Sequence, residues 1–222
     1  MPSYNDMKLG YRNLWEEAKV KRIDVVNKAA DNILRDKSRY ESIEARTGVP
    51  WFWIACVHHR ESNRDFRGIL HNGERIIGTG RKTKLVPKGR GPFSSWEEAA
   101  VDALTAKPHA LHTINQWSIE RCLYEFERYN GWGYNGKINS PYVWAATSQQ
   151  QRGKYVRDGK FDSNHWDAQL GCAALLKSLV QKDQSVSSAI YNASQPKPTP
   201  PKPKSSGIWA AILALFKALF RR

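Results

Sequence analysis

Apolar residues recur at helical spacing in the first part of the chain. Within residues 11–46, Leu14, Ala18 and Val25 stand on one side of a helical repeat, and charged residues fill many of the positions between them. This spacing is typical of an amphipathic helix that packs on a core. The Thr47-Gly48 pair ends the pattern. We therefore predict a helical region over residues 11–46.

The next stretch is apolar at its beginning and polar at its end. Residues 51–57 are all apolar, whereas residues 58–62 read His-His-Arg-Glu-Ser. Pro50 precedes them, and proline suits the start of a helix because the amide hydrogen that it lacks would be unpaired there. This pattern predicts a buried helix over residues 51–62. Its polar end places Glu61 at the boundary between the core and solvent.

Residues 67–91 lack the helical repeat. The Asn72-Gly73 pair separates two short apolar runs. Asn-Gly favours the tight turn of a β-hairpin because both residues tolerate positive φ angles. Glycine, lysine and arginine are frequent between residues 78 and 91. We expect a small β-hairpin at 67–77 that continues into an exposed, flexible flap.

Ser95 and Glu98 have the spacing of a capping box, in which two side chains satisfy free backbone N–H groups at the start of a helix. A helix is therefore expected from residue 96 to about residue 106. Further helices are predicted at residues 118–129, 141–146 and 167–181, with a glycine-rich loop at 131–136. The fold class expected for residues 1–193 is thus mostly α, with a small β-hairpin flap.

The composition changes after residue 193. Residues 194–206 are rich in proline and lysine, which is typical of an extended linker. The apolar run at 208–220 is shorter than the ~20 residues that a membrane-spanning helix needs. We therefore interpret residues 207–222 as an amphipathic, membrane-active helix at an interface. Docking of this helix on the domain and an engineered origin stay open. The residues expected to contact a membrane are Trp209, Leu213, Phe216, Lys217, Phe220, Arg221 and Arg222.

The chain is strongly basic, with a formal net charge of +14 from 35 Lys and Arg residues and 21 Asp and Glu residues. Such a surface attracts polyanions, including nucleic acid, anionic lipid and the bacterial envelope. Nine Trp and nine Tyr residues supply flat rings that stack on sugars and bases. A nucleic-acid-binding protein stays open as an alternative, but the sequence contains no helix-turn-helix or RNP pattern.

The cysteines and histidines do not have the spacing of a metal site. The three cysteines are far apart and lack a Cys-x-x-Cys pair, and the six histidines lack the His-Glu-x-x-His pattern. We expect free thiols, no metal and no cofactor. Cys56 has His58 and His59 close by, so a nucleophilic Cys–His pair is an alternative, although Cys56 lies in an apolar run.

Glu61 has the surroundings that acid catalysis requires. Cleavage of a glycosidic bond needs a carboxylic acid that stays protonated near neutral pH and donates its proton to the leaving oxygen. Partial burial beside apolar groups raises a carboxyl pKa into that range. Glu61 follows the apolar residues 51–57. It is therefore the candidate general acid.

Several stretches resemble proteins of the lysozyme superfamily. Residues 54–62 are similar to the catalytic helix of goose-type lysozymes and soluble lytic transglycosylases, in which an apolar helix ends in Arg/Gln-Glu-Ser and the Glu is the acid. Tyr129-Asn130-Gly131 resembles the Tyr-Asn pair that borders this Glu in transglycosylases. Residues 91–98 and 130–134 are similar to phage and prophage endolysins. The resemblance covers about residues 40–180 and implies a lysozyme-like α+β fold.

The resemblance also implies roles for other residues. In lysozyme-like folds the hairpin faces the catalytic Glu across the cleft, which makes Glu74 the candidate second carboxylate and Asp65 the next choice. The chain lacks the Gly-Leu-Met-Gln-type segment of transglycosylases and the triad spacing of T4-type lysozymes. The residues expected to bind substrate are Ser62, Tyr129, Asn130, Trp132, Tyr134 and Tyr142.

We accordingly expect a lysozyme-type endolysin, a monomer that cleaves the N-acetylmuramic acid–N-acetylglucosamine backbone of peptidoglycan. Lytic transglycosylase activity on the same bond is the first alternative. A chitinase-like enzyme, a metal-dependent peptidoglycan amidase and a nucleic-acid-binding protein are further ones. Residues 1–13 lack the apolar segment of a signal peptide. We therefore expect the protein in the host cytoplasm before lysis and at the cell wall in the periplasm afterwards, with its C-terminal helix on anionic membrane or outer-membrane lipid.

Overall fold

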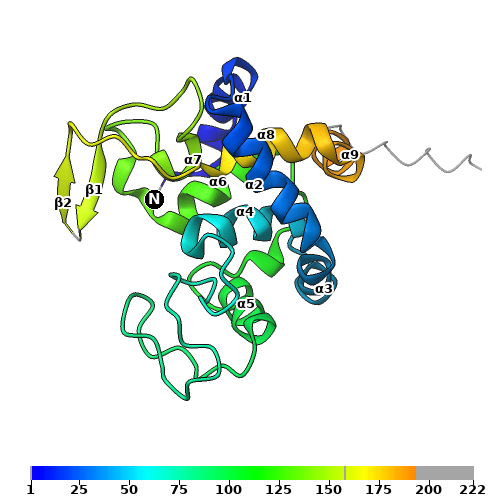
Figure 1. Cartoon of the computed structure of the whole chain (residues 1–222). Helices are drawn as coiled ribbons and strands as arrows, with labels where there is room; N and C mark the ends of the chain where they lie inside the picture. The colour runs from blue at the N-terminus through cyan, green and yellow to red at the C-terminus, as the bar shows by residue number, and fades with distance from the viewer. Residues whose placement is uncertain (1, 158, 194–222) are drawn as a thin grey trace, which may run out of the picture.

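The computed structural model describes residues 2–157 and 159–193, and the linker and the membrane-active helix predicted at 194–222 lie outside these residues. Helix α4 (Trp51–Ser62) runs through the centre of the described domain, and the other long helices surround it (Figure 1). Nine of its twelve residues are buried. The prediction of a buried helix over 51–62 is confirmed.

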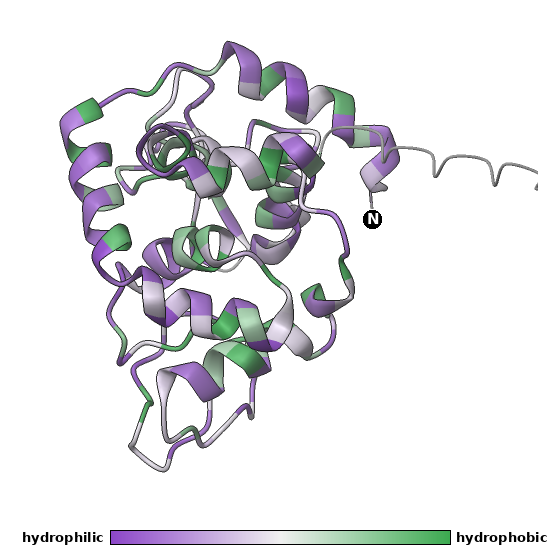
Figure 2. Cartoon of the chain, turned by 90° about the vertical axis from the view of Figure 1, so that its right-hand side faces the viewer, coloured by the Kyte–Doolittle hydropathy of each residue, from purple (hydrophilic) through white to green (hydrophobic). Residues whose placement is uncertain are grey.

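The helices that surround α4 pack against it and against one another. α1 contacts α6, α2 contacts α8, and α3 contacts both α4 and α5. The short α7 joins α6 to α8, and α8 contacts α9. The outer helices carry alternating hydrophilic and hydrophobic bands, as amphipathic helices do (Figure 2). Their bounds are α1 Tyr4–Glu17, α2 Ile23–Arg35, α3 Lys37–Thr47, α5 Trp96–Thr105, α6 Ile119–Asn130, α7 Pro141–Trp144, α8 Cys172–Lys182 and α9 Gln184–Ala193, with short 3-10 helices at Leu111–Thr113 and Trp132–Tyr134.

The core around α4 is aromatic. The ring of Trp53 stacks on Phe126 of α6 with the centroids 5.1 Å apart. The Trp53 indole N–H donates a hydrogen bond of 3.2 Å to the carbonyl oxygen of Cys122. Because this polar atom is paired, the large side chain can be fully buried without an unsatisfied donor. These contacts fix the position of α4 relative to α6. Both helices end at the candidate site.

The helical region predicted at residues 11–46 consists of parts of three helices. The chain leaves α1 at Ala18, which is extended at ψ 123°, and it enters α2 after Arg22, which has φ 54°. Neither conformation fits a continuous helix. Between them, Val20 forms an isolated β-bridge with Thr147. This contact is distant in the sequence, so the local pattern could not indicate the break.

The helices predicted at 96–106, 118–129 and 141–146 correspond to α5, α6 and α7. Ser95 caps α5 as expected, because its side chain accepts a hydrogen bond from the backbone N–H of Glu98. The helix predicted at 167–181 starts later, at Cys172, and α9 was not predicted. Asp167 lies before the helix, and its buried carboxylate is held in an ion pair with Arg60.

The β-hairpin predicted at residues 67–77 is wrong. This segment forms turns with one isolated β-bridge between Gly68 and Arg75. The turn itself exists, since Gly73 has φ +76°. It packs so closely on α4 that a Cβ atom at Gly73 would lie 2.3 Å from the carbonyl oxygen of Glu61. Residues 67–77 thus form a turn that packs on the end of α4, and they do not form the two paired strands of a hairpin.

The two-stranded sheet of the described residues lies elsewhere, and the sequence analysis did not predict it. β1 (Lys154–Arg157) pairs antiparallel with β2 (Lys160–Asp162). Across the pair, the rings of Tyr155 and Phe161 lie 5.3 Å apart. The mostly α character of the expected fold class is confirmed, whereas the small β-hairpin was predicted at 67–77 and the antiparallel sheet lies at 154–162. None of the described helices is both long and apolar enough to cross a bilayer.

Candidate active site

Glu61 lies in the last turn of α4, and its side chain is partly buried. Its Oε1 atom accepts a hydrogen bond of 2.7 Å from the hydroxyl of Tyr142. Burial raises the pKa of Glu61 to about 7, although the Tyr142 hydroxyl and the charge of Arg60 act to lower it. A carboxyl group with this pKa is protonated in a large fraction of molecules at neutral pH, as a general acid must be.

A cleft of about 450 Å³ opens beside the Glu61 side chain. It forms where the ends of α4 and α6 meet α7, strand β1 and the segment before α8. This is a volume that accommodates a small ligand or part of a polymer. The cleft is lined by Arg60, Glu61, Asn130, Gly131, Gly133, Tyr134, Tyr142, Lys154, Tyr155 and Gln169.

Tyr142 is positioned by α7, at whose first position stands Pro141. The Tyr142 side chain is buried, and burial and the adjacent Glu61 carboxyl hold its pKa well above the ordinary value. Its hydroxyl therefore stays protonated and acts only as a donor toward Glu61. The guanidinium of Arg60 lies 5.2 Å from the centre of the Tyr142 ring. This contact supports the ring from α4.

Arg60 belongs to a buried ion-pair network at the cleft. Its guanidinium pairs with the carboxylate of Asp167, which also accepts a hydrogen bond of 2.9 Å from Nζ of Lys154. Although burial acts to raise the pKa of Asp167, the charge of Arg60 holds it below the ordinary value. Two cations thus share one carboxylate. The network joins α4, β1 and the segment before α8, and it leaves positive charge at the cleft.

Tyr129 and Asn130 at the end of α6 have different positions. Tyr129 is buried and donates a hydrogen bond of 2.9 Å to the carbonyl oxygen of Leu70. Burial and the charge of Glu61 raise its pKa, so Tyr129 lies near Glu61 without lining the cleft. Asn130 is exposed and lines the cleft. Of the predicted pair, Asn130 is therefore placed to touch a ligand directly.

Of the aromatic residues predicted to bind substrate, some line the cleft and others do not. Tyr134 lines the cleft, and its hydroxyl accepts a hydrogen bond of 3.1 Å from the backbone N–H of Tyr155. Trp132 does not line it, and its ring lies 5.1 Å from the ring of Tyr124 in the core. Ser62 holds the chain after α4, because its hydroxyl is within hydrogen-bond distance of the carbonyl oxygen of Asp65 at 3.2 Å.

The structure does not bring Glu74 into the cleft. Its carboxylate accepts hydrogen bonds from the backbone N–H groups of Lys84 and Leu85, at 3.0 and 2.8 Å, and from the Asn72 side chain. Burial acts to raise its pKa, but these bonds hold the pKa below the ordinary value. Glu74 therefore anchors the flap at 78–91, which projects beside α5 (Figure 1).

Asp65, the other candidate second carboxylate, also lies outside the cleft lining. It pairs with the exposed side chains of Arg67 and Arg75. The hydrogen bond from Arg67 lowers the pKa of Asp65 to about 2. Its carboxylate is thus a partner of surface arginines. In the described lining of the cleft, Glu61 is the one carboxyl group.

Sequence reasoning did not select several residues that line the cleft, among them Lys154, Tyr155 and Gln169. These three belong to β1 and to the segment before α8, where the sequence shows no strong pattern. Tyr155 and Val156 are of residue types that favour strands, and this weak signal is what could have indicated β1. Their place beside Glu61 depends on the tertiary fold.

The described residues contain no cluster of three or more His, Cys, Asp or Glu side chains that could hold a metal ion. Cys56 is buried in α4, and burial raises the pKa of its thiol. A buried, protonated thiol is a poor nucleophile. The Cys–His alternative therefore has no support in the described geometry.

We compared the chain with known proteins. No protein-family model matches it, and no curated protein or solved structure shows significant similarity to it.

Proposed function

We propose that this protein cleaves the glycan strands of peptidoglycan and that Glu61 is its proton donor. One observation carries the proposal: a partly buried carboxyl with a pKa of about 7 borders a cleft of about 450 Å³. A buried carboxyl costs free energy when it is charged. Its position at the mouth of a cleft, rather than within the core, favours a catalytic role.

The geometry around Glu61 supports transfer of one proton. The Tyr142 hydroxyl bonds to Oε1 of Glu61, so Oε2 is the atom that would hold the proton for a glycosidic oxygen. After transfer, the new carboxylate keeps the Tyr142 hydrogen bond and the favourable charge of Arg60. Both interactions strengthen as negative charge develops on Glu61. They therefore stabilise the transition state more than the ground state.

The rest of the cleft suits a sugar. Tyr134 and Tyr155 supply aromatic rings, and Asn130 and Gln169 supply amides that can both donate and accept hydrogen bonds. Lys154 adds positive charge. An amino sugar that carries an acetamido group and a carboxylate would use all three kinds of contact. N-acetylmuramic acid is such a sugar. The resemblance of residues 54–62 to goose-type lysozymes and soluble lytic transglycosylases, and of residues 130–134 to endolysins, points to the same substrate.

Lytic transglycosylase activity on the same bond is a second candidate. The observation that favours it is the single carboxyl in the described lining of the cleft. Glycosidases that activate water generally use a second carboxylate as base or nucleophile. Mass spectrometry of the released muropeptides separates the two reactions, because the transglycosylase product is an anhydro sugar that is lighter by one water.

The test of the proposal is the variant Glu61→Gln, assayed on purified peptidoglycan. Gln keeps the size of the side chain and an oxygen that accepts the hydrogen bond from Tyr142, but it has no acidic proton to transfer. We expect activity to fall by a factor of about 10²–10⁴, the usual contribution of general acid catalysis. The matched control is Glu44→Gln in α3. Glu44 is partly buried, its pKa is raised, and it accepts a hydrogen bond from the backbone N–H of Trp51 at the start of α4. We expect this control to keep wild-type activity. Undiminished activity in Glu61→Gln would overturn the proposal.

The new chain ends in the released fragments identify the bond that is cleaved. New reducing ends or anhydro ends indicate glycan cleavage, whereas new amino termini indicate an amidase. The amidase alternative further predicts inhibition by a chelator. Salt-sensitive DNA binding without any release of peptidoglycan fragments would favour the nucleic-acid alternative.

The basic surface and the C-terminal segment fit the same cellular role. A net charge of +14 attracts the protein to the anionic bacterial envelope. We propose that residues 207–222 bind anionic membrane or outer-membrane lipid. Deletion of these residues should preserve activity on purified peptidoglycan and reduce lysis of intact Gram-negative cells. Equal loss of both activities would contradict this role.

A further inference from the structure

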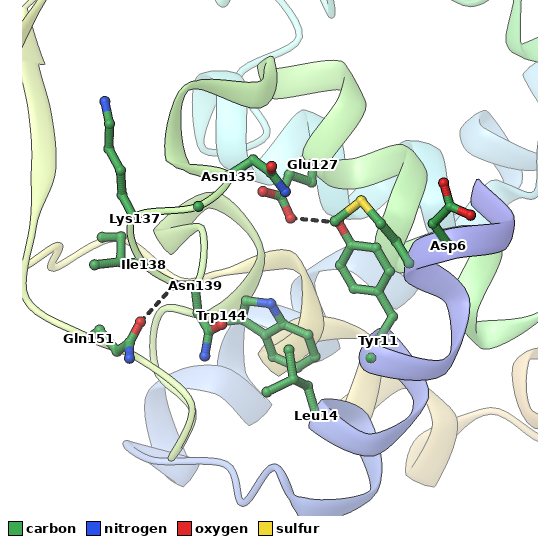
Figure 3. Close-up of a pocket in the computed structure, with 13 residues that line it drawn as sticks. Asp6, Tyr11, Leu14, Glu127, Asn135, Lys137, Ile138, Asn139, Trp144 and Gln151 are labelled. Carbon is green, nitrogen blue, oxygen red and sulfur yellow. Dashed lines mark hydrogen bonds between the residues drawn. The ribbon is translucent and has the colours of Figure 1, made fainter. Parts of the chain in front are cut away.

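A second cavity, of about 440 Å³, lies between α1, the C-terminal part of α6 and the segment 135–139 (Figure 3). None of its lining residues belongs to the lining of the Glu61 cleft. One part of its wall is apolar, formed by Met7, Leu14, Ile138 and Trp144. Another part carries the acidic side chains Asp6 and Glu127.

Glu127 is a buried carboxyl group with no cation beside it. Its side chain accepts a hydrogen bond of 2.6 Å from the Tyr11 hydroxyl, and Figure 3 shows the two groups meeting at the cavity. Glu127 itself is only 5% exposed. The other buried carboxylates of the described residues, Glu120, Glu125 and Asp167, each pair with an Arg or Lys side chain. Glu127 differs from them in facing open space instead.

The one cation in the lining of this cavity does not neutralise Glu127. Nζ of Lys137 donates a hydrogen bond of 2.5 Å to the Tyr155 hydroxyl and lies 5.6 Å from the centre of the Phe161 ring. In Figure 3 the Lys137 side chain extends away from Glu127. The cavity therefore keeps an acidic character, which is unusual in a chain with a net charge of +14.

We propose that this cavity binds a primary ammonium group carried on an aliphatic chain. The ammonium would take the place beside Glu127 that an Arg or Lys side chain takes at the other buried carboxylates. The aliphatic chain would lie along Met7, Leu14 and Ile138, next to the Trp144 ring. A compact ammonium with three donors can bond to a carboxylate and to nearby carbonyl oxygens at once. This proposal is independent of glycan cleavage at Glu61.

Burial raises the pKa of Glu127, and the Tyr11 hydrogen bond only partly offsets that effect. A bound ammonium lowers the pKa of an adjacent carboxyl. Where Glu127 is partly protonated, binding of the amine should therefore release a proton. Calorimetry in two buffers with different ionisation enthalpies measures this release, and a merely hydrophobic ligand would not produce it.

The experiment is isothermal titration of the full chain with two probes of the same chemistry. Cadaverine represents a free diamine, and Nα-acetyl-lysine amide represents a diamino acid within a peptide. Pentanol is the neutral control, because it has a similar aliphatic length and no charge. Saturable binding of either amine, with much weaker binding of pentanol, supports the proposal and identifies the preferred source. Absence of saturable binding of both amines overturns it.

Variants assign the binding to this cavity. Glu127→Gln should weaken amine binding by about tenfold or more, since it leaves the ammonium without a counter-charge. Glu16→Gln removes the same charge from an exposed position of α1 and should bind like the wild type. Gly10 lies on the cavity wall in α1, and no atom lies within 4 Å of a Cβ placed there.

The Leu side chain in Gly10→Leu should occupy part of the cavity. The substitution should also stabilise α1, because Leu has a higher helix propensity than Gly. It should abolish amine binding with no loss of thermal stability. Wild-type affinity in both Glu127→Gln and Gly10→Leu would refute the site. Each variant should keep the peptidoglycan-cleaving activity of the wild type, so failure of this proposal is distinguishable from failure of the catalytic one.

Discussion

Tyr142 and Glu61 are 81 positions apart in the sequence, and their side chains are joined by a hydrogen bond of 2.7 Å from Oη to Oε1. The donor comes from the short helix α7 and the acceptor from the last turn of α4. The bond fixes the orientation of the carboxyl at the cleft. It also stabilises the charged form of Glu61 and so limits the rise in pKa that burial causes.

Removal of this donor should change the pH dependence of catalysis. In Tyr142→Phe, the pKa of Glu61 should rise above its value of about 7, because the carboxylate loses a hydrogen bond. The alkaline limb of the pH–activity profile should then move to higher pH, and the maximal rate should fall because the carboxylate formed after proton transfer is less stable. The profile on purified peptidoglycan measures both effects. Tyr191→Phe, at an exposed position of α9, is the control.

Glu61 should also make stability depend on pH. Its pKa is about 4.5 in an unfolded chain and about 7 in the fold, so the folded state binds the proton more tightly. The contribution of this proton binding to the free energy of unfolding is fully present below about pH 4.5, and it is lost as pH rises through about 7. The difference amounts to at most about 3 kcal/mol.

Glu61→Gln removes this dependence, because Gln does not titrate. Urea unfolding should therefore show the variant to be more stable than the wild type at pH 8, with a smaller difference at pH 5. An advantage of the variant that is equal at both pH values would contradict a raised pKa for Glu61.

Glu74 should prove to be an anchor of the flap. In Glu74→Ala the backbone N–H groups of Lys84 and Leu85 lose their acceptor, which should loosen residues 78–91. Trypsin should then cut faster at the Lys and Arg residues of this segment. Peptidoglycan cleavage should fall far less than in Glu61→Gln. A loss of activity as large as that of Glu61→Gln, with unchanged proteolysis, would restore Glu74 as the second catalytic carboxylate.

Gly73 should be essential for the position of Glu61. An alanine there would place its Cβ 2.3 Å from the carbonyl oxygen of Glu61, at a backbone φ of +76°. Gly78→Ala is the matched control, since Gly78 has φ +70° and no atom lies within 4 Å of a Cβ placed there. Gly78→Ala should cost about 1–2 kcal/mol from backbone strain alone.

Gly73→Ala carries the same strain and a steric clash in addition. Thermal unfolding should show a clearly larger loss of stability than in Gly78→Ala, and activity should fall with it. Equal stability of the two variants would show that the turn can move away from α4 without cost.

The sequence by itself determined most of the helical segments and the candidate acid, but it missed α9 and the breaks between α1, α2 and α3. The change from apolar to polar residues at 57–58 indicated both the buried helix α4 and the position of Glu61 at the boundary between core and solvent, because one local pattern governs both. Asn130, Tyr134 and Tyr142, which the sequence indicated as substrate-binding residues, line the cleft beside Glu61. Their role in binding stays a prediction.

Only the tertiary structure decided the partners of these residues. Arg60 pairs with Asp167 over 107 positions, and Lys154 reaches the same carboxylate from a strand that no strong pattern indicated. Glu74 lies outside the cleft, because the turn at Gly73 packs on α4 and the Glu74 carboxylate accepts hydrogen bonds from the flap. Periodicity reports which side of a segment is buried. It does not report which distant segment will cover that side, because long-range packing and the pairing of buried charges determine that contact.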